Sequence, residues 1–292
     1  MIDNTLVQHL VNTQFPEWKD LSIQPIANSG WDNRTFHLGK EMLVRMPSAA
    51  EYATQVEKEH KWLPKLAQLL PLPIPEPLAM GEPTNDYPWK WSIYRFLDGE
   101  TAASAHINDM TEFAASLAKF LIALQHIDAQ DLPKPGPHNF YRGGMLTTYD
   151  TETRQAISIL ERKIDARSAT DLWETALSTT WKHPPVPIHG DISAGNFLIQ
   201  EGQLSAVIDF GMLAIGDPAC DLAIAWTLFD PESRKVFREM LPLDKDTWER
   251  GRAWALWKSL IVAAGMTSTN SIEAKHVWES IDKVLVDHKE KS

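Results

Sequence analysis

The sequence has almost no cysteine, no long apolar run and no excess of basic residues. Its only cysteine in 292 residues is Cys220, which excludes an internal disulfide and suits a reducing compartment. No run approaches the roughly 18 apolar residues that a membrane-spanning helix needs, and Met1–Asn4 lacks the basic and apolar segments of a signal peptide. We therefore expect a cytoplasmic protein without a membrane partner, in which Cys220 is a buried apolar residue.

The charge is negative and unevenly distributed. The formal net charge is −11, and from Asp98 onward there are 19 basic and 28 acidic residues. This balance argues against a nucleic-acid partner, because binding to a phosphate backbone requires a basic surface. It is compatible with a cationic small molecule drawn into an acidic cleft, although acidity that only maintains solubility explains the same numbers.

Most of the recognisable chemistry lies in the stretch Val186–Asp217. His189-Gly190-Asp191 follows a short apolar run, and Asn196 comes five residues after Asp191. A hairpin-like pair of segments then leads to Asp209-Phe210-Gly211. The two segments of this pair are Phe197–Gln200 and Leu204–Ile208.

These residue types suit phosphoryl transfer from a nucleotide to a hydroxyl. The reaction requires one base and a set of metal ligands, and little covalent chemistry from the protein. We predict that Asp191 accepts the hydroxyl proton and that Asn196 and Asp209 bind Mg²⁺, a hard cation that prefers oxygen ligands. The alternative is that Asp191 and Asn196 are ordinary turn residues that cap backbone groups.

The motifs resemble those of the aminoglycoside phosphotransferase family of small-molecule kinases. The residues that carry the resemblance are His189-Gly190-Asp191, Asn196, Ile208-Asp209-Phe210-Gly211 and Gly216-Asp217-Pro218-Ala219-Cys220-Asp221. The similarity extends over about Ala27–Ala264. Gly190 stands where protein kinases have arginine, which points away from a protein substrate.

The resemblance implies an α+β, protein-kinase-like fold of two lobes. The expected N-terminal lobe, residues 1–97, contains an antiparallel sheet and binds the nucleotide. The expected C-terminal lobe, residues 98–292, is larger, mostly helical, and carries the catalytic and acceptor-binding residues. Mg²⁺ and ATP or GTP are the expected cofactor and phosphoryl donor.

The predicted elements of the N-terminal lobe are short strands and two helices. Strands are expected where apolar and β-branched residues alternate between turn residues, and helices where apolar residues recur every three or four positions. Pro64 predicts a kink or break in the second helix, and the proline-rich segment 71–77 reads as an extended strap. The predicted strands are 22–27, 34–38, 41–46 and 89–96, and the helices are 4–14 and 51–70.

The nucleotide contacts follow from the resemblance. Ser29 and Gly30 lie where kinases have a phosphate-covering loop, although an ordinary hairpin loop has the same residues. Arg45 lies where kinases have the third-strand lysine, and the alternative is an exposed strand cation. Glu59 is the expected acidic partner of Arg45, with Glu57 as the second choice and a solvated glutamate as the alternative. Backbone at Arg95, Phe96 and Leu97 is expected to bind the nucleotide base.

The C-terminal lobe is predicted to be mostly helical. We interpret Trp226, Trp254 and Trp257 as core residues, because large aromatic side chains usually supply buried area. Asp217 and Asp221 are interpreted as structural braces of the catalytic loop. The predicted helices are 109–127, 148–164, 170–181, 218–229, 232–240, 246–266 and 272–287.

The predicted activity is transfer of the γ-phosphoryl of a nucleoside triphosphate to a hydroxyl of a small molecule. By resemblance the acceptor is an aminoglycoside-like antibiotic, which implies antibiotic resistance. Kinases of macrolides, choline, homoserine or sugars use the same motifs, and a catalytically inactive nucleotide-binding module is the alternative from another class. The acidic residues expected to attract a cationic acceptor are Asp230, Glu232, Asp244, Asp246 and Glu249.

Overall fold

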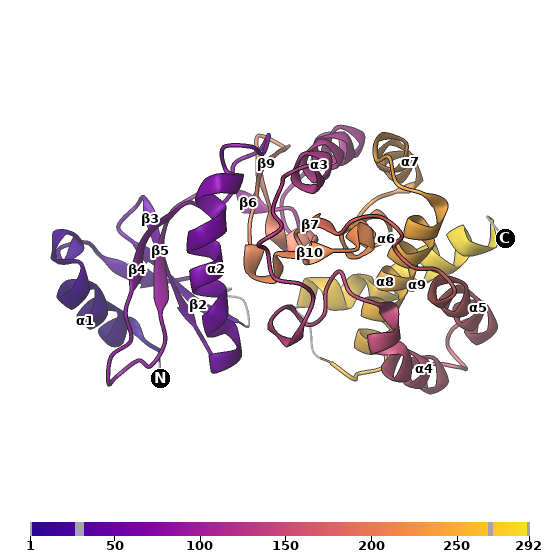
Figure 1. The fold of residues 1–292 in the computed structure, drawn as a ribbon, viewed down its shortest axis with the longest axis horizontal. Coiled ribbons are helices and arrows are strands. Elements are labelled where there is room, and N and C mark those ends of the chain that lie inside the picture. Colours follow the sequence, from indigo (N-terminus) through magenta and orange to yellow (C-terminus); the bar gives the residue numbers. More distant parts are fainter. Residues whose placement is uncertain (1, 27–31, 268–270, 291–292) are drawn as a thin grey trace. The chain divides into compact units, whose positions relative to one another are not determined.

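The computed structural model describes residues 2–26, 32–267 and 271–290. The chain forms two compact units, one made of residues 1–99 and 205–211 and the other of residues 100–204 and 212–292 (Figure 1). The lobes predicted from the sequence, 1–97 and 98–292, stay a prediction. The predicted boundaries assigned residues 205–211, which carry Asp209, to the C-terminal lobe, whereas in the structure these residues belong to the first unit.

The first unit is built on a five-stranded antiparallel sheet with the strand order β1-β2-β3-β5-β4. Register is fixed by pairs such as Phe36 with Val44 and Val44 with Ile93. The strands are β1 (Ile23–Pro25), β2 (Asn33–Leu38), β3 (Met42–Pro47), β4 (Pro77–Gly81) and β5 (Trp91–Arg95).

Two helices cover opposite faces of this sheet (Figure 1). Helix α1 (Asn4–Gln14) begins at the cap Asp3 and buries its apolar stripe against Val44 and Met46 of β3. Because side chains alternate across a strand, Arg45 points to the other face, where α2 (Ala50–Leu66) lies. The sheet therefore separates an apolar layer under α1 from a polar layer under α2.

Two details of this unit differ from the sequence predictions. Helix α2 continues through Pro64 without a break and ends at Leu66, two residues after the proline, although Pro64 supplies no N–H to the helix's hydrogen bonds. Strand β4 was not predicted, since its proline-rich approach read as a strap. Pro77 is tolerated because β4 lies at the edge of the sheet.

The second unit is mostly helical, as predicted. Two small antiparallel pairs precede or follow the motifs that carry Asp191 and Asp209. They are β7 (Val186–Ile188) with β10 (Ala214–Gly216), and β6 (Glu100–Thr101) with β8 (Phe197–Gln200). The chain passes to the first unit within β9 (Gln203–Val207). The helices are α3 (Met110–Gln125), α4 (Asp150–Ile159), α5 (Ala166–Leu177), α6 (Ile224–Thr227), α7 (Pro231–Met240), α8 (Lys245–Ala263) and α9 (Ser271–Lys289).

Aspartate caps fix the starts of four helices in this unit. Each carboxylate accepts backbone N–H groups of the first turn, which have no partner inside the helix. The capping residues are Asp109, Asp165, Asp230 and Asp244. The predicted helix 218–229 is instead a 3-10 turn at Pro218–Leu222 followed by the short α6. In the part of the chain that is described, no helix is long and apolar enough to cross a membrane.

Candidate active site

The loop that carries Asp191 is fixed by buried hydrogen bonds. The two carboxylate oxygens of Asp221, which is fully buried, accept the N–H groups of His189 at 2.9 Å and Gly190 at 2.8 Å. Nδ1 of His189 accepts the N–H of Asp191 at 3.2 Å. Gly190 has φ +83°, and a Cβ there would lie 2.7 Å from the carbonyl oxygen of Met212. These contacts support a structural role for Asp221 and a loop-fixing role for His189.

Asn196 is oriented by Asp191. Its Nδ2 donates to the backbone oxygen of Asp191 at 2.8 Å and to Oδ2 of the same residue at 2.9 Å. An amide nitrogen is a donor and does not coordinate a cation, so Oδ1 is the atom of Asn196 that could coordinate one, and the predicted metal contact stays a prediction. The carboxylate of Asp191 is 36% exposed and therefore accessible to a substrate hydroxyl.

The charges around Asp191 keep its carboxylate ionised. Burial raises the pKa of Asp191, but the cations Lys258 and Arg142 and the hydrogen bond from Asn196 more than compensate, and the pKa lies below its usual value. Lys258 Nζ lies 3.8 Å from Asp191 Oδ1. Neither cation was predicted from the sequence, because they are distant from the motif and form no motif of their own.

In the first unit, Arg45 connects the predicted metal ligand to helix α2. Its guanidinium lies 3.2 Å from Asp209 Oδ1 and 3.7 Å from Glu59 Oε1. The hydroxyl of Tyr94 also donates to Glu59. Glu57, by contrast, pairs with Lys90 at 2.5 Å. Glu59 is thus the acidic partner of Arg45, and the predicted contact of this pair with the nucleotide stays a prediction.

The Asp209-Phe210-Gly211 turn is held in an unusual backbone conformation. Asp209 has φ +66°, in the left-handed region that non-glycine residues rarely adopt. Lys58 Nζ donates to the carbonyl oxygen of Gly211 at 2.6 Å, and a Cβ at Gly211 would lie 2.7 Å from Gln55 Oε1. Residues held in such conformations cluster at functional sites, which supports a functional role for Asp209.

Electrostatic coupling links the residues of this part of the first unit. Burial lowers the pKa of Arg45, but Asp209 and Glu59 raise it above its usual value. Burial, and next the negative charge of Asp209, raise the pKa of Asp32 to about 6. Asp32 lies within the segment 29–33 that was predicted as the phosphate-covering loop, but it was not singled out as a site residue.

The other predicted nucleotide contacts are only partly described. Ser29 and Gly30 lie outside the described residues. The N–H of Arg95 donates to Glu76 at 2.9 Å and that of Phe96 donates to Glu41 at 2.7 Å, so neither N–H is available to a nucleotide base while these bonds hold. The predicted contacts at Arg95, Phe96 and Leu97 stay predictions.

Most of the acidic residues expected to attract the acceptor are otherwise engaged. Glu249 is buried and pairs with Arg252 at 2.5 Å, so its predicted part in attracting a cation is wrong. Asp230 and Asp244 cap helices, and Asp246 pairs with Lys182 at 3.4 Å. The interpretation of three tryptophans as core residues is confirmed by their burial. These are Trp226, Trp254 and Trp257, and Cys220 is buried as expected.

The predicted metal ligands carry donor atoms of the kind that Mg²⁺ prefers. The residues that the structure describes include no cluster of three or more His, Cys, Asp or Glu that could hold a metal ion. Asp209 and Asn196 supply one carboxylate and one amide oxygen. These are hard donors of the kind that bind Mg²⁺, which takes the rest of its ligands from phosphates and water.

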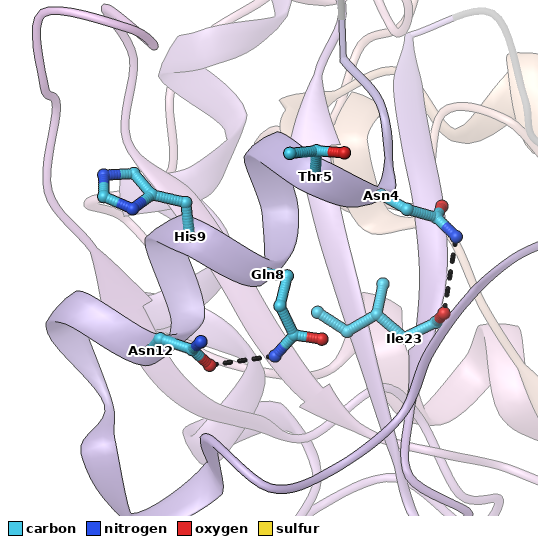
Figure 2. A pocket seen from close by; sticks show the side chains of 6 residues that line it. All are labelled: Asn4, Thr5, Gln8, His9, Asn12 and Ile23. Atoms are coloured by element: carbon cyan, nitrogen blue, oxygen red, sulfur yellow. Dashed lines mark hydrogen bonds between the residues drawn. The ribbon is translucent and has the colours of Figure 1, made fainter.

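The pocket shown in Figure 2 has a different character. It is lined by residues of α1 and by Ile23 of β1, and Asn4 Nδ2 donates to the Ile23 carbonyl at 3.4 Å. Since α1 covers the face of the sheet opposite to α2, this pocket is separated from Arg45 by the sheet. Its lining contains one imidazole, that of His9, and no carboxylate. The lining residues are Asn4, Thr5, Gln8, His9, Asn12 and Ile23.

Comparison with known proteins identifies the family. The family model described as "phosphotransferase enzyme family" (APH) matches residues 22–254. The chain belongs to the phosphotransferase enzyme family. This confirms the family predicted from the motifs. No curated protein gives a significant match to the sequence.

Solved structures of phosphotransferases share the fold. The GDP complex of wild-type aminoglycoside 2'-phosphotransferase-IIIa has a TM-score of 0.70 at 17% identity, with 98% of this chain and 99% of that chain covered. The streptomycin-ATP-APH(2")-IIa ternary complex has a TM-score of 0.61 at 18% identity, with 97% of each chain covered. Macrolide 2'-phosphotransferase MphH from Brachybacterium faecium, as the apoenzyme, has a TM-score of 0.61 at 19% identity, with 96% of this chain and 98% of that chain covered.

These similarities confirm the protein-kinase-like fold. As a member of the phosphotransferase enzyme family, the chain is a small-molecule phosphotransferase in the coarse sense that the family and the fold support. The nucleotide, the acceptor and the roles of individual residues belong to the proposal below.

Proposed function

We propose that the chain transfers the γ-phosphoryl of a nucleoside triphosphate to a hydroxyl of a small molecule, with Asp191 as the general base. The observation that carries the proposal is the fixed, ionised and accessible carboxylate of Asp191, which Asn196 orients through a bond of 2.9 Å. The acceptor oxygen attacks the γ-phosphorus while the bond to the leaving diphosphate breaks. Asp191 takes the hydroxyl proton.

The metal and nucleotide sites are part of the same proposal. Asn196 Oδ1 and the Asp209 carboxylate hold Mg²⁺, which neutralises charge on the nucleotide phosphates when bound. Arg45, oriented by Glu59, contacts the phosphates. Ser29 and Gly30 cover them with backbone N–H groups, and the chain at 95–97 contacts the base. ATP and GTP both remain candidate donors, since the structural neighbours include complexes with ATP, ADP and GDP.

An aminoglycoside-like antibiotic is the first candidate acceptor, and antibiotic resistance is its consequence. The support is that solved neighbours are described as complexes with kanamycin, streptomycin and gentamicin. A kinase of another small hydroxyl compound is the second candidate, because the cations Lys258 and Arg142 lie near the catalytic carboxylate. We infer a cytoplasmic location. The support is that Cys220 is buried and forms no disulfide.

A screen for release of nucleoside diphosphate tests the function. The purified chain is incubated with Mg²⁺ and either ATP or GTP, and with aminoglycosides, macrolides, amino alcohols, hydroxy acids or sugars. We expect one class to stimulate release in the wild type and not in Asp191→Asn. Mg²⁺-dependent nucleotide binding without turnover of any class would instead identify an inactive nucleotide-binding module.

A further inference from the structure

One face of helix α2 carries polar residues that are buried in the first unit. Gln55, Lys58 and Glu59 share this face, because residues three and four positions apart are neighbours on a helix surface. Gln55 and Glu59 are each only 4% exposed. Residues 205–211 belong to the same unit as α2, and the turn at 209–211 contacts two of these side chains.

Lys58 binds the backbone of this turn. Its Nζ donates to the carbonyl oxygen of Gly211 at 2.6 Å. Burial lowers the pKa of Lys58 to about 8, and the negative charges of Glu59 and Asp209 act in the opposite direction. Removing an ammonium group from water costs free energy unless a hydrogen bond or an opposite charge compensates. The carbonyl of Gly211 provides such a hydrogen bond, so this contact stabilises the charged form of Lys58.

Gln55 makes a steric contact with the same turn. A Cβ at Gly211 would lie 2.7 Å from Oε1 of Gln55 and 2.9 Å from its Cδ, both shorter than van der Waals contact. Nε2 of Gln55 is buried and has no hydrogen-bond partner among the described residues. Because an unpaired buried amide destabilises a fold, the contribution of Gln55 is its packing against Gly211. Glycine at this position allows the turn to approach α2 closely enough for the bond from Lys58.

The bond from Lys58 fixes the backbone directly after Asp209. Phe210–Met212 is a single 3-10 turn, and the carbonyl that Lys58 binds belongs to its central residue. Asp209 precedes this turn and has φ +66°. A non-glycine residue in the left-handed region is unfavourable, and it keeps this conformation only where surrounding contacts hold the neighbouring backbone. Lys58 makes such a contact two residues along the chain.

The side chain of Asp209 is held separately by Arg45. Nη2 of Arg45 lies 3.2 Å from Oδ1 of Asp209, and the Asp209 side chain remains 31% exposed. Helix α2 is itself fixed to the sheet, because Glu59 accepts the hydroxyl of Tyr94 on β5 and lies 3.7 Å from Arg45 on β3. One cation of the first unit thus holds the side chain of Asp209 and another holds the backbone beside it, while the carboxylate stays partly accessible.

We propose that Lys58 is a positioning residue of the metal-nucleotide site. Through the carbonyl of Gly211 it holds the left-handed backbone of Asp209, and this orients the carboxylate toward Mg²⁺. Lys58 itself contacts neither the metal nor the nucleotide phosphates. The inference rests on the proposed function, in which Asp209 binds Mg²⁺. Loss of the ammonium group should therefore weaken binding of the Mg²⁺-nucleotide complex and leave binding of the metal-free nucleotide almost unchanged.

Three variants on α2 test the proposal by calorimetric titration with Mg²⁺ and ATP or GTP. The titrations are made at about pH 7, where Lys58 is charged. Lys58→Met removes the charge and the donors at a similar side-chain length, and Lys58→Arg keeps both. Lys65→Met is the control, since it removes the same charge from an exposed position on the same helix.

The expected result is a loss of affinity confined to Lys58→Met. The Kd of the Mg²⁺-nucleotide complex should rise by about tenfold or more in this variant, the ratio expected for one hydrogen bond from a charged group. In Lys58→Arg and Lys65→Met it should stay within about threefold of the wild-type value. Thermal midpoints are measured in parallel. Equal losses in Lys58→Met and Lys58→Arg, with lowered midpoints in both, would assign Lys58 to fold stability and overturn the proposal.

The dependence on metal separates positioning from direct contact with the nucleotide. The same proteins are titrated with nucleotide in excess EDTA, by displacement of a fluorescent N-methylanthraniloyl nucleotide. If Lys58 acts through Asp209, the Kd of the metal-free nucleotide in Lys58→Met should lie within about threefold of the wild-type value. Equal losses with and without Mg²⁺ would make Lys58 a direct nucleotide contact and refute the positioning role.

The outcomes also separate this inference from the proposed function. Asp191-dependent turnover in the wild type, together with unchanged Mg²⁺-nucleotide affinity in Lys58→Met, would remove Lys58 from the site and leave the phosphotransferase intact. If the wild type binds neither Mg²⁺-ATP nor Mg²⁺-GTP, the proposed function and this inference fail together.

Discussion

Asp221 binds the loop that carries Asp191 through both of its oxygens. Oδ2 accepts the N–H of His189 at 2.9 Å and Oδ1 accepts the N–H of Gly190 at 2.8 Å. Burial raises the pKa of Asp221, and the two backbone bonds act in the opposite direction. A buried carboxylate thus fixes the backbone immediately before Asp191, which requires the segment 218–222 to pack against this loop.

Removal of this carboxylate should destabilise the protein. We expect Asp221→Ala to lower the free energy of unfolding by about 2–5 kcal/mol, because two buried N–H groups lose a charged acceptor. Urea denaturation measures the change. The control Glu174→Ala, at a glutamate whose side chain is 55% exposed and pairs with Arg154, should cost less than about 1 kcal/mol. Equal losses in the two variants would contradict the bracing role.

Substitution of the base should affect turnover and not nucleotide binding. Asp191→Asn keeps an oxygen for the bond from Asn196 and removes the proton acceptor. We expect kcat to fall by about 10²–10⁴-fold, while the Kd of the Mg²⁺-nucleotide complex stays within about threefold as measured by calorimetry. Near-normal turnover would remove Asp191 from the mechanism.

Substitution of the carboxylate at the Asp209 turn should abolish binding of the metal-nucleotide complex. Asp209→Ala removes the proposed Mg²⁺ ligand and one of the two carboxylates that pair with Arg45. Calorimetric titration with Mg²⁺ and ATP or GTP measures the effect. Glu57→Ala is the matched control, since its side chain is 63% exposed and pairs with Lys90. Unchanged affinity in Asp209→Ala would show that the ion binds elsewhere.

The raised pKa of Asp32 predicts a pH-dependent gain in stability for Asp32→Asn. Between about pH 4, where the unfolded carboxyl titrates, and the folded pKa of about 6, the folded state holds more protons than the unfolded state. Stability therefore falls as pH rises through this window. We expect the variant to be more stable than the wild type by about 1–3 kcal/mol above pH 6 and equally stable below pH 4.

Urea denaturation of both proteins checks this prediction. The measurements are made without Mg²⁺ or nucleotide, from pH 3.5 to pH 7 in steps of roughly half a pH unit. The difference between the two free energies of unfolding isolates the contribution of Asp32 from other titrating groups. A difference that does not change with pH would show that Asp32 titrates normally in the folded state.

Local elements were predictable where a local signal exists. The helix 4–14 was predicted with both ends, because Asp3 and Asn4 before an apolar helical period are start signals. The structure shows that Asp3 is the cap. The segment 218–229 was predicted as one helix and is instead a 3-10 turn followed by α6. Asp221 in this turn accepts bonds from a loop distant in the sequence, which local periodicity does not signal. Strand β4 was missed because the prolines before it do not indicate a strand. Its strand conformation depends on hydrogen bonds to β5.

Candidate site residues could be singled out where they form a motif. Asp191, Asn196 and Asp209 do so through their spacing, and their catalytic and metal-binding roles stay predictions. Arg142 and Lys258 could not be singled out, since a single arginine in a loop and a single lysine on a helix carry no such signal. The acidic composition after Asp98 suggested a cationic acceptor, but charge counts do not show which carboxylates cap helices or pair internally.

The sequence by itself determined the family, the class of fold and the candidate residues of the motif, because these depend on residue types at fixed spacing along the chain. Only the tertiary structure decided which carboxylate pairs with Arg45, which groups hold the turn at Asp209, and which charges lie near Asp191. Those relationships join residues far apart in the sequence. They depend on burial and on the distances between charges, and the composition of a sequence contains neither.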